Sequence, residues 1–200
     1  MAITIAETAD VDATASIGEG SKIWHLAHIR DGVVIGENCI VSRGAYIGSG
    51  VKIGDNCKIQ NFALVYEPAL LGNGVFIGPA VVLTNDQYPR AVNPDLTLKG
   101  GSDWEAVGVT IGDGASIGAQ SVCIAPVKIG AWALVAAGSV VVKDVPEFAL
   151  VAGNPAKRIR WVGRAGVPLI DLGDNKFKCP ITGDEFDEIN SHHLIEKEKG

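Results

Sequence analysis

One aliphatic residue returns at every sixth position between residues 11 and 83, without a slip. The residues that share this spacing are Val11, Ile17, Ile23, Ile29, Ile35, Val41, Ile47, Ile53, Ile59, Val65, Leu71, Ile77 and Leu83. The spacing resumes at Ile111, Ile117, Cys123, Ile129, Val135 and Val141. Such a period is typical of a hexapeptide β-helix, in which stacked turns bury one shared core. The sequence therefore predicts an all-β fold, a parallel β-helix with an external loop and a small C-terminal extension.

A second inward column follows from the alternation of side chains along a strand. The residue two positions before each aliphatic residue is small in most repeats, as at Ala15, Ser21, Ala27, Cys39, Ala45, Cys57 and Ala63. We expect the Gly and Asn residues between strands to lie at corners, where they adopt positive φ at little cost. The composition, with 6% aromatic residues and 25 glycines, suits a core of small aliphatic side chains.

The period divides the chain into three parts. Residues 1–145 form the predicted β-helix, in which residues 1–10 are a lead-in strand or cap and residues 85–106 are an external loop. Residues 146–165 are expected to form a strand, a turn and a helical segment. Residues 166–200 are expected to form a small hairpin around residues 182–184, with a frayed end at 196–200.

One face of the predicted coil differs from a solvated surface. Its outward columns are His28, Tyr46, Leu64, Val82 and Arg30, Gly48, Tyr66, Thr84. A solvated face normally carries Lys, Glu and Ser, whereas scattered single apolar residues are ordinary. We therefore expect this face to be buried against another copy of the chain. The loop leaves the coil from the same face, and its Tyr88, Arg90 and Trp104 favour an ordered, contacting segment.

The cysteines point to packing. Cys39 and Cys57 are 18 residues apart, one turn of a three-sided coil, so we expect reduced thiols in contact on adjacent turns. Cys123 occupies an aliphatic position of the repeat. Cys179 lies in the tail. The chain has no CxxC pair, which argues against a zinc site.

Charge and hydropathy exclude several classes of protein. The net charge is −6 and no block of Lys and Arg is present, so we expect neither nucleic acid nor an anionic membrane as a partner. No apolar run approaches the roughly 18 residues that a membrane helix needs, so no membrane insertion is expected. The acidic first ten residues do not resemble a secretion signal, and a cytoplasmic protein is the expectation.

Several segments resemble a known family. The repeat, its external loop and KDVPEFALVAGNPAKRI resemble the hexapeptide-repeat acyltransferases. More narrowly, IWHLAHIRDGVVIGENC, KIQNFALVY and VFIGPAVVLTNDQYPRA resemble the bacterial nucleotide-sugar N-acetyltransferases, in particular those that acetylate the 3-amino group of UDP-2-acetamido-3-amino-2,3-dideoxyglucuronate in surface-polysaccharide (lipopolysaccharide) synthesis. The resemblance covers roughly residues 10–165. It departs at Phe62, where relatives commonly repeat Asn, at the Glu67–Pro68 pair, and in the loop from residue 92 to 105.

The resemblance implies a left-handed coil and a homotrimer with sites between subunits. It also implies acetyl-CoA as co-substrate, a UDP- or dTDP-linked 3-amino sugar as acceptor, and no metal. The implied reaction is attack of the sugar amine on a thioester. An unprotonated amine is already nucleophilic, so positioning and oxyanion stabilisation matter more than a strong base.

Two residues are candidates for catalysis. Asn85 lies in the TN...PRA motif at the mouth of the loop, and the resemblance places such an Asn near the reacting amine. Its amide can accept from the amine or donate to the oxyanion, although an Asn at a corner can also be a left-handed turn residue. His28 points outward on the unusual face and is either a base or a subunit contact.

The remaining site predictions form two groups. Tyr66, Glu67, Asp86, Tyr88 and Arg90 lie near the loop mouth and are predicted to bind the acceptor, with Arg90 suited to a pyrophosphate or a carboxylate. The predicted coenzyme-binding residues are Ala119, Ala137, Pro155, Lys157 and Arg158. Ala119 and Ala137 are 18 residues apart, so they should stack into a smooth ridge against which a thin, extended ligand can lie.

Other readings of the same fold remain open. An O-acetyltransferase or an acyltransferase of another small amine fits the same coil. A γ-type carbonic anhydrase needs three His ligands, whereas only His25 and His28 lie in the coil. A non-catalytic structural trimer has no use for the long external loop.

Overall fold

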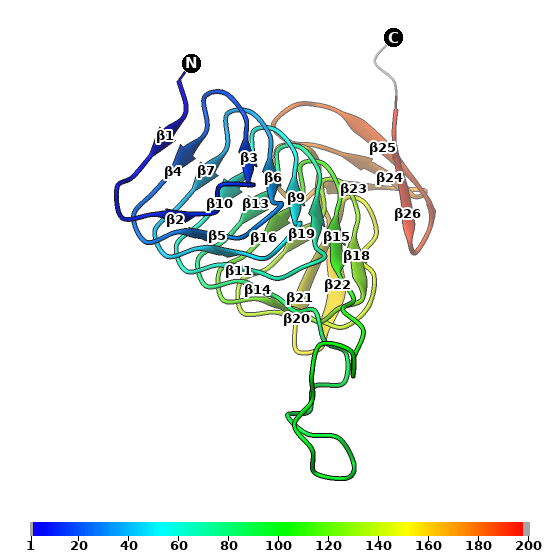
Figure 1. Cartoon of the computed structure of the whole chain (residues 1–200). Coiled ribbons are helices and arrows are strands. Elements are labelled where there is room, and N and C mark those ends of the chain that lie inside the picture. The colour runs from blue at the N-terminus through cyan, green and yellow to red at the C-terminus, as the bar shows by residue number, and fades with distance from the viewer. Residues whose placement is uncertain (1, 198–200) are drawn as a thin grey trace.

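The computed structural model describes residues 2–197, which form a triangular coil closed at one end by a small sheet (Figure 1). Most coil strands are two residues long, and successive strands fall in turn on sheets B, C and A. Residues 2–197 contain only strands, turns and loops, so no helix there is long and apolar enough to cross a membrane. The predicted all-β coil is thus confirmed.

Three sheets form the sides of the coil, and their strands run parallel except for the last strand of sheet A. Sheet A contains β1 (Thr4–Ile5), β4 (Lys22–Ile23), β7 (Ile40–Val41), β10 (Lys58–Ile59), β13 (Phe76–Ile77), β16 (Ser116–Ile117), β19 (Leu134–Val135), β21 (Ala149–Gly153) and β22 (Ala156–Trp161). Sheet B contains β2 (Asp10–Val11), β5 (His28–Ile29), β8 (Tyr46–Ile47), β11 (Leu64–Val65), β14 (Val82–Leu83), β17 (Val122–Cys123) and β20 (Val140–Val141). Sheet C contains β3 (Ser16–Ile17), β6 (Val34–Ile35), β9 (Lys52–Ile53), β12 (Leu70–Leu71), β15 (Val109–Ile111) and β18 (Val127–Ile129).

The register between turns follows the sequence period. Ile47 pairs with Val65 and Val65 with Leu83, a step of 18 residues each time. Across the loop the step becomes 40 residues, since Leu83 pairs with Cys123. Both inward columns are buried from the second turn onward, with Ile59 and Ile77 0% exposed and no equivalent more than 5% exposed. The predicted core residues are therefore correct from the second turn onward, whereas Val11 and Ile17 on the first turn remain partly exposed.

The corner glycines serve two different purposes. Gly44 and Gly50 adopt positive φ, as predicted. Gly78 does not, so for it the prediction is wrong. Gly78 is needed because a Cβ there would lie 2.6 Å from the backbone nitrogen of Ala119 on the next turn. Glycines that directly follow an inward aliphatic residue thus permit close stacking of successive corners.

The stacked cysteines are free and buried. The backbone N–H of Cys57 donates to Cys39 Sγ at 3.4 Å, and each thiol donates to the carbonyl of a glycine on the following turn at 3.1 Å. The side chain of Cys123 is also buried. These three thiols therefore act as core residues, as expected.

The external loop projects from the corner between β14 and β15 (Figure 1). Its tip is a small hairpin in which Val92 bridges Leu98 and the Asn93 N–H donates to the Thr97 carbonyl at 2.9 Å. Leu96 and Leu98 are each 81% exposed at this tip. The loop is therefore internally bonded, yet it presents apolar side chains to its surroundings.

The C-terminal part closes the coil. Strands β21 and β22 form an antiparallel hairpin, so the predicted helical segment in residues 146–165 is wrong. A four-stranded antiparallel sheet follows, formed by β23 (Ile170–Gly173), β24 (Lys176–Lys178), β25 (Glu185–Asn190) and β26 (His193–Glu196). The rings of Phe148 and Phe186 lie 5.3 Å apart, and Trp161, which belongs to the same core cluster, is 2% exposed. These contacts seal the open end of the core.

The expected hairpin around residues 182–184 is β24 and β25. The expected fraying at 196–200 is wrong for Glu196, which belongs to β26, and for Lys197, whose N–H donates to the Glu185 carbonyl. Residues 198–200 of that prediction lie outside the described residues.

Candidate functional site

Asn85 lies at the corner between sheets B and C, where the external loop begins; this place is called the loop corner below. The Val107 N–H donates to the Asn85 carbonyl at 2.9 Å, which joins the two ends of the loop. The preceding Thr84 is fixed as well, because its hydroxyl accepts from the Ala125 N–H at 2.9 Å. Asn85 is not among the residues with positive φ, so the alternative role as a left-handed turn residue is wrong. Its amide has no hydrogen-bond partner within residues 2–197 and is available to a ligand.

A ladder of aromatic and charged side chains leads toward this corner on the outer face of sheet B. The His28 and Tyr46 rings lie 5.4 Å apart edge to face, and the Tyr46 and Tyr66 rings lie 5.3 Å apart. His28 Nε2 lies 3.6 Å from Asp10 Oδ2. Arg30 Nη1 donates to the Tyr46 hydroxyl at 3.4 Å. This bond, together with nearby carboxylates, raises the pKa of Arg30 above its usual value. Arg30 therefore gives this ladder a permanent positive charge.

Glu67 lies directly below Asn85 in the corner column. Its carboxylate lies over Gly48 on the preceding turn, in space that any Cβ at position 48 would fill. Glu67 Oε2 is buried and accepts no hydrogen bond within the described residues. A buried carboxylate oxygen without a donor is costly, so this corner is a place where an incoming N–H or O–H group would be stabilised.

The two predicted catalytic residues do not meet within one chain. His28 pairs with Tyr46, Tyr46 with Leu64, and Leu64 with Val82, so three strand spacings separate His28 from the strand that precedes Asn85. Each spacing is about 4.8 Å, and the total of roughly 14 Å exceeds the reach of an imidazole. Within one chain, His28 therefore lies on the same face as Asn85 but does not share a site with it.

The loop gathers some of the predicted acceptor residues and leaves one out. A cavity of about 280 Å³ is lined by Asp86, Gln87, Tyr88, Lys99, Asp103, Trp104, Glu105 and Val107. Asp86 Oδ1 accepts from the Tyr88 N–H at 2.8 Å and shapes the loop mouth. Arg90 does not line this cavity; its guanidinium donates to the carbonyl of Pro89. Tyr66 and Glu67 belong to the loop corner.

The predicted coenzyme residues lie along another edge, where sheet A turns into sheet B; this is called the A–B edge below. Ala119 and Ala137 stack there, since the Gly138 N–H donates to the Ala119 carbonyl at 2.8 Å. The β21–β22 turn, which contains Pro155, continues this edge, because the Gly153 N–H donates to Ser139 Oγ at 3.2 Å. Lys157 is exposed beside it. The edge is therefore smooth and ends at a lysine.

Arg158 lies apart from that edge. Its guanidinium is 4.1 Å from the centre of the Trp161 ring and 3.3 Å from Glu188 Oε1. These contacts tie the hairpin to the C-terminal sheet. The structure thus supports a packing role for Arg158.

Sequence reasoning did not assign Arg30, Tyr46 or Gly48 to the site, although all three occupy its outward columns. The available signal was the 18-residue spacing, which places Gly48 beneath Tyr66 and next to Glu67, whose carboxylate lies over the glycine. A glycine beneath a carboxylate indicates space made for that side chain. Recognising this needed the turn-to-turn register rather than the six-residue period alone.

Comparison with known proteins places the repeats in a family. The bacterial transferase hexapeptide (six repeats) family matches residues 14–49 and 50–85, and the hexapeptide repeat of succinyl-transferase matches residues 108–143. These matches together cover more than half of the chain.

Individual proteins agree with this assignment. Serine acetyltransferase 2 of Arabidopsis thaliana is 40% identical over 103 residues, which is 48% of this chain and 26% of that protein. The dTDP-3-amino-3,6-dideoxy-alpha-D-galactopyranose 3-N-acetyltransferase of Aneurinibacillus thermoaerophilus is 59% identical over 44 residues, which is 22% of this chain and 23% of that protein. The chain thus spans about a quarter of the length of these two curated relatives.

A hexapeptide-repeat acetyltransferase from Vibrio cholerae, solved with acetyl coenzyme A, has a TM-score of 0.54 and 27% identity, covering 66% of this chain and 72% of that chain. The chain therefore belongs to the hexapeptide-repeat family of bacterial transferases, and its coil is a left-handed parallel β-helix.

Proposed function

We propose that the protein is an acetyl-CoA-dependent N-acetyltransferase that acetylates the 3-amino group of a UDP- or dTDP-linked amino sugar for bacterial surface polysaccharide. The observation that carries the proposal is Asn85, whose backbone is held at the loop corner without left-handed geometry, while its side-chain amide has no partner within residues 2–197. The short stretch of 59% identity to a 3-N-acetyltransferase of a dTDP-amino sugar supports the acceptor class. The acetyl coenzyme A bound to the Vibrio cholerae relative supports the donor.

The proposed reaction is one acyl transfer. The lone pair of the sugar amine attacks the thioester carbonyl carbon, and a tetrahedral oxyanion forms. The carbon–sulfur bond then breaks, the acetyl group stays on nitrogen, and the amine proton leaves with the thiol of coenzyme A. Asn85 can orient the amine by accepting from it or stabilise the oxyanion by donating to it. Placement of the two substrates supplies much of the rate, because the amine is already a nucleophile.

The proposed site is shared between copies of the chain. Within one chain, the A–B edge and the loop corner are opposite margins of sheet B, six residues apart along an extended segment, or roughly 20 Å. A coenzyme on Ala119 and Ala137 therefore does not bring its thioester to Asn85 of the same chain. A trimer that buries sheet B brings the loop corner of one copy to the A–B edge of the next.

The test is direct. The protein mixed with acetyl-CoA and a UDP-linked 3-amino sugar should release free thiol and add one acetyl group to the sugar, as read by mass spectrometry. A parallel panel contains the dTDP-linked 3-amino sugars and the corresponding 3-hydroxy sugars. Turnover confined to the hydroxyl acceptors would show an O-acetyltransferase and refute the amine assignment.

Asn85→Ala should lower kcat well beyond tenfold, because one positioning or oxyanion contact is typically worth 10²–10³ in rate. Asn190→Ala, the same change at the exposed end of β25, is the control and should keep wild-type turnover. Both variants should melt near the wild-type temperature. Near-normal turnover by Asn85→Ala would remove this residue from the mechanism.

A further inference from the structure

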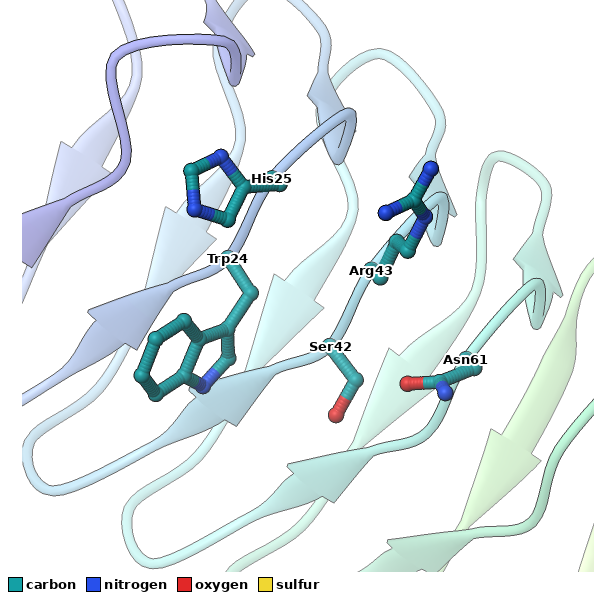
Figure 2. Close-up of a pocket in the computed structure, with 5 residues that line it drawn as sticks. All are labelled: Trp24, His25, Ser42, Arg43 and Asn61. Atoms are coloured by element: carbon teal, nitrogen blue, oxygen red, sulfur yellow. The ribbon is translucent and has the colours of Figure 1, made fainter.

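A pocket outside the predicted site lies on the A–B edge near the N-terminal end of the coil. Figure 2 shows its five lining side chains, which rise from three successive corners. Its volume is about 280 Å³, and its lining is Trp24, His25, Ser42, Arg43 and Asn61. One aromatic ring, one cation and three polar groups thus share one opening.

The polar groups of this pocket are not used by the protein itself. Within residues 2–197 the Arg43 guanidinium has neither an ion pair nor a hydrogen bond, and the Ser42 hydroxyl and Asn61 amide also have no partner. Ser42 is only 8% exposed, so its hydroxyl faces the pocket rather than open solvent. His25 is oriented by a 2.8 Å hydrogen bond between Nδ1 and Thr8 Oγ1, which leaves Nε2 for a ligand. An unpaired guanidinium in a pocket with further unpartnered polar groups favours an anionic ligand.

The corners around the pocket are held in costly conformations. Leu26 and Phe62, which follow His25 and Asn61, have φ of 59° each, a region that bulky side chains rarely adopt. Both side chains are more than half exposed, so burial of their own surface does not explain them. The equivalent corner residues Gly44, Ala80, Gln120 and Gly138 also have positive φ, so this conformation belongs to the coil as a whole.

The pocket and the predicted coenzyme ridge belong to the same edge. The residues that follow the sheet A strands in corner order are His25, Arg43, Asn61, Pro79, Ala119 and Ala137. The pocket therefore occupies the first three corners and the ridge the last two. Pro79 lies between them, on the corner that precedes β14, and Asn85 follows β14 on the same turn.

We infer that this pocket binds the nucleoside diphosphate of the acceptor, with Arg43 on the phosphates and the exposed Trp24 ring against the base. This inference rests on the proposed function, which makes the acceptor a nucleotide-linked sugar. It adds that the acceptor lies along the A–B edge, with its nucleotide at the N-terminal end. Three corners span roughly 10 Å, which suits a base and two phosphates. The sugar then extends past Asn61 to the level of Pro79, where it meets a thioester that arrives from Ala119. In a trimer whose axis is parallel to the coil, Asn85 of the next copy lies at this same level.

The ligand chemistry has two sources, because coenzyme A also contains a nucleoside diphosphate. Titration of the whole protein with UDP, dTDP and coenzyme A separately, followed by Trp fluorescence and calorimetry, distinguishes them. UDP or dTDP should bind and persist in the presence of saturating coenzyme A. Displacement of UDP by coenzyme A would overturn the assignment, since it would place the coenzyme in this pocket.

Arg43→Ala should weaken UDP binding at least tenfold and raise KM for the nucleotide sugar to a similar degree, while KM for acetyl-CoA stays within about twofold. Arg43→Lys keeps the charge and should recover part of the affinity. Lys52→Ala on exposed sheet C is the matched control. The melting temperature of Arg43→Ala should equal that of wild type, because Arg43 makes no ion pair with any other residue of 2–197.

The inference and the proposed function fail in different ways. Normal KM values for Arg43→Ala in an active enzyme would refute the pocket assignment and leave the N-acetyltransferase intact. UDP binding that depends on Arg43, without acetylation of any amino sugar, would keep the pocket and refute the reaction.

Discussion

At the scale of single residues, the corner positions show how one backbone conformation serves several purposes. Gly44, Phe62 and Ala80 occupy equivalent places on successive turns, and all three have positive φ. Glycine adopts it freely, whereas Phe62 is strained there. The Phe62 ring lies over Gly44, where a Cβ would lie 2.6 Å from Cδ1 of the ring. Because Gly44 has no side chain, the Phe62 ring can lie over it.

Phe62→Asn should raise the free energy of unfolding by about 1 kcal/mol, because Asn tolerates the left-handed region and Phe62 is 57% exposed. Phe76→Asn is the control; it lies on β13 with ordinary strand geometry, where Asn is a poor strand former, and it should lower stability. Urea unfolding of both variants gives the comparison. A clear loss of stability in Phe62→Asn would show that the ring's contact with Gly44 outweighs its strain.

Cys123 gives a pH dependence of stability. Its thiol is fully buried, and burial raises its pKa from 9.0 to about 12. The folded state therefore favours the protonated thiol, so this contribution is complete below pH 9 and is lost as the pH rises from 9 to 12. At pH 10 the loss amounts to about 1.4 kcal/mol relative to pH 8. Cys123→Val restores the usual aliphatic residue and should reduce the alkaline decline by that amount, as measured by urea unfolding at both pH values. An identical decline in both proteins would contradict the assignment.

At the scale of elements, the sequence predicts most where a period is imposed by stacking. The inward columns could be identified because every turn must bury the same positions, and Ile59 or Ile77 has no alternative environment. The four-stranded C-terminal sheet could not be predicted beyond its central hairpin, since it is stabilised by non-periodic contacts such as that between Phe148 and Phe186. The loop hairpin between Val92 and Leu98 likewise depends on local turn bonds that carry no repeat.

The candidate site was predicted in part for the same reason. The position of Asn85 at a corner follows from the period, and so does the stacking of Ala119 and Ala137. The pairing of Arg158 with Glu188 was not predictable, because it joins residues 30 positions apart across two unrelated sheets.

The external loop behaves as an insertion in an otherwise regular coil. Ile111 follows Leu83 by 28 positions instead of six, so deletion of the 22 residues 85–106 restores the six-residue spacing. The deleted protein should keep the coil and melt near the wild-type temperature, because the loop adds little to the core. It should have no acetyltransferase activity, since Asn85 and the loop cavity are gone. Removal of residues 91–99 alone separates the role of the loop tip from that of the loop corner. A deletion variant that fails to fold would show that the loop supports the coil.

At the scale of the whole molecule, the three sides of the coil differ in what they present outward. Sheet C mixes polar and apolar residues along its outer column: Ser16, Val34, Lys52, Leu70, Thr110 and Lys128. The corresponding column of sheet B is apolar from Tyr46 onward and continues through Leu64, Val82, Val122 and Val140. Adjacent apolar side chains across five strands form a patch of the kind that marks a protein interface. A second copy of the chain suits it, because the proposed site needs the loop corner and the A–B edge of different copies.

Leu64→Lys on sheet B should therefore convert the proposed trimer of three 20.9 kDa chains into monomers and abolish acetyl transfer. A lysine at the centre of an apolar interface leaves a charge that is desolvated without a partner. Leu70→Lys is the matched control, because it introduces the same charge at a 45% exposed position on sheet C and should leave both assembly and turnover unchanged. Light scattering coupled to size exclusion gives the mass, and circular dichroism checks that each variant keeps its coil. A wild-type protein that elutes as a monomer with full activity would contradict both the interface and the shared site, since Asn85 would then have to meet the thioester within one chain.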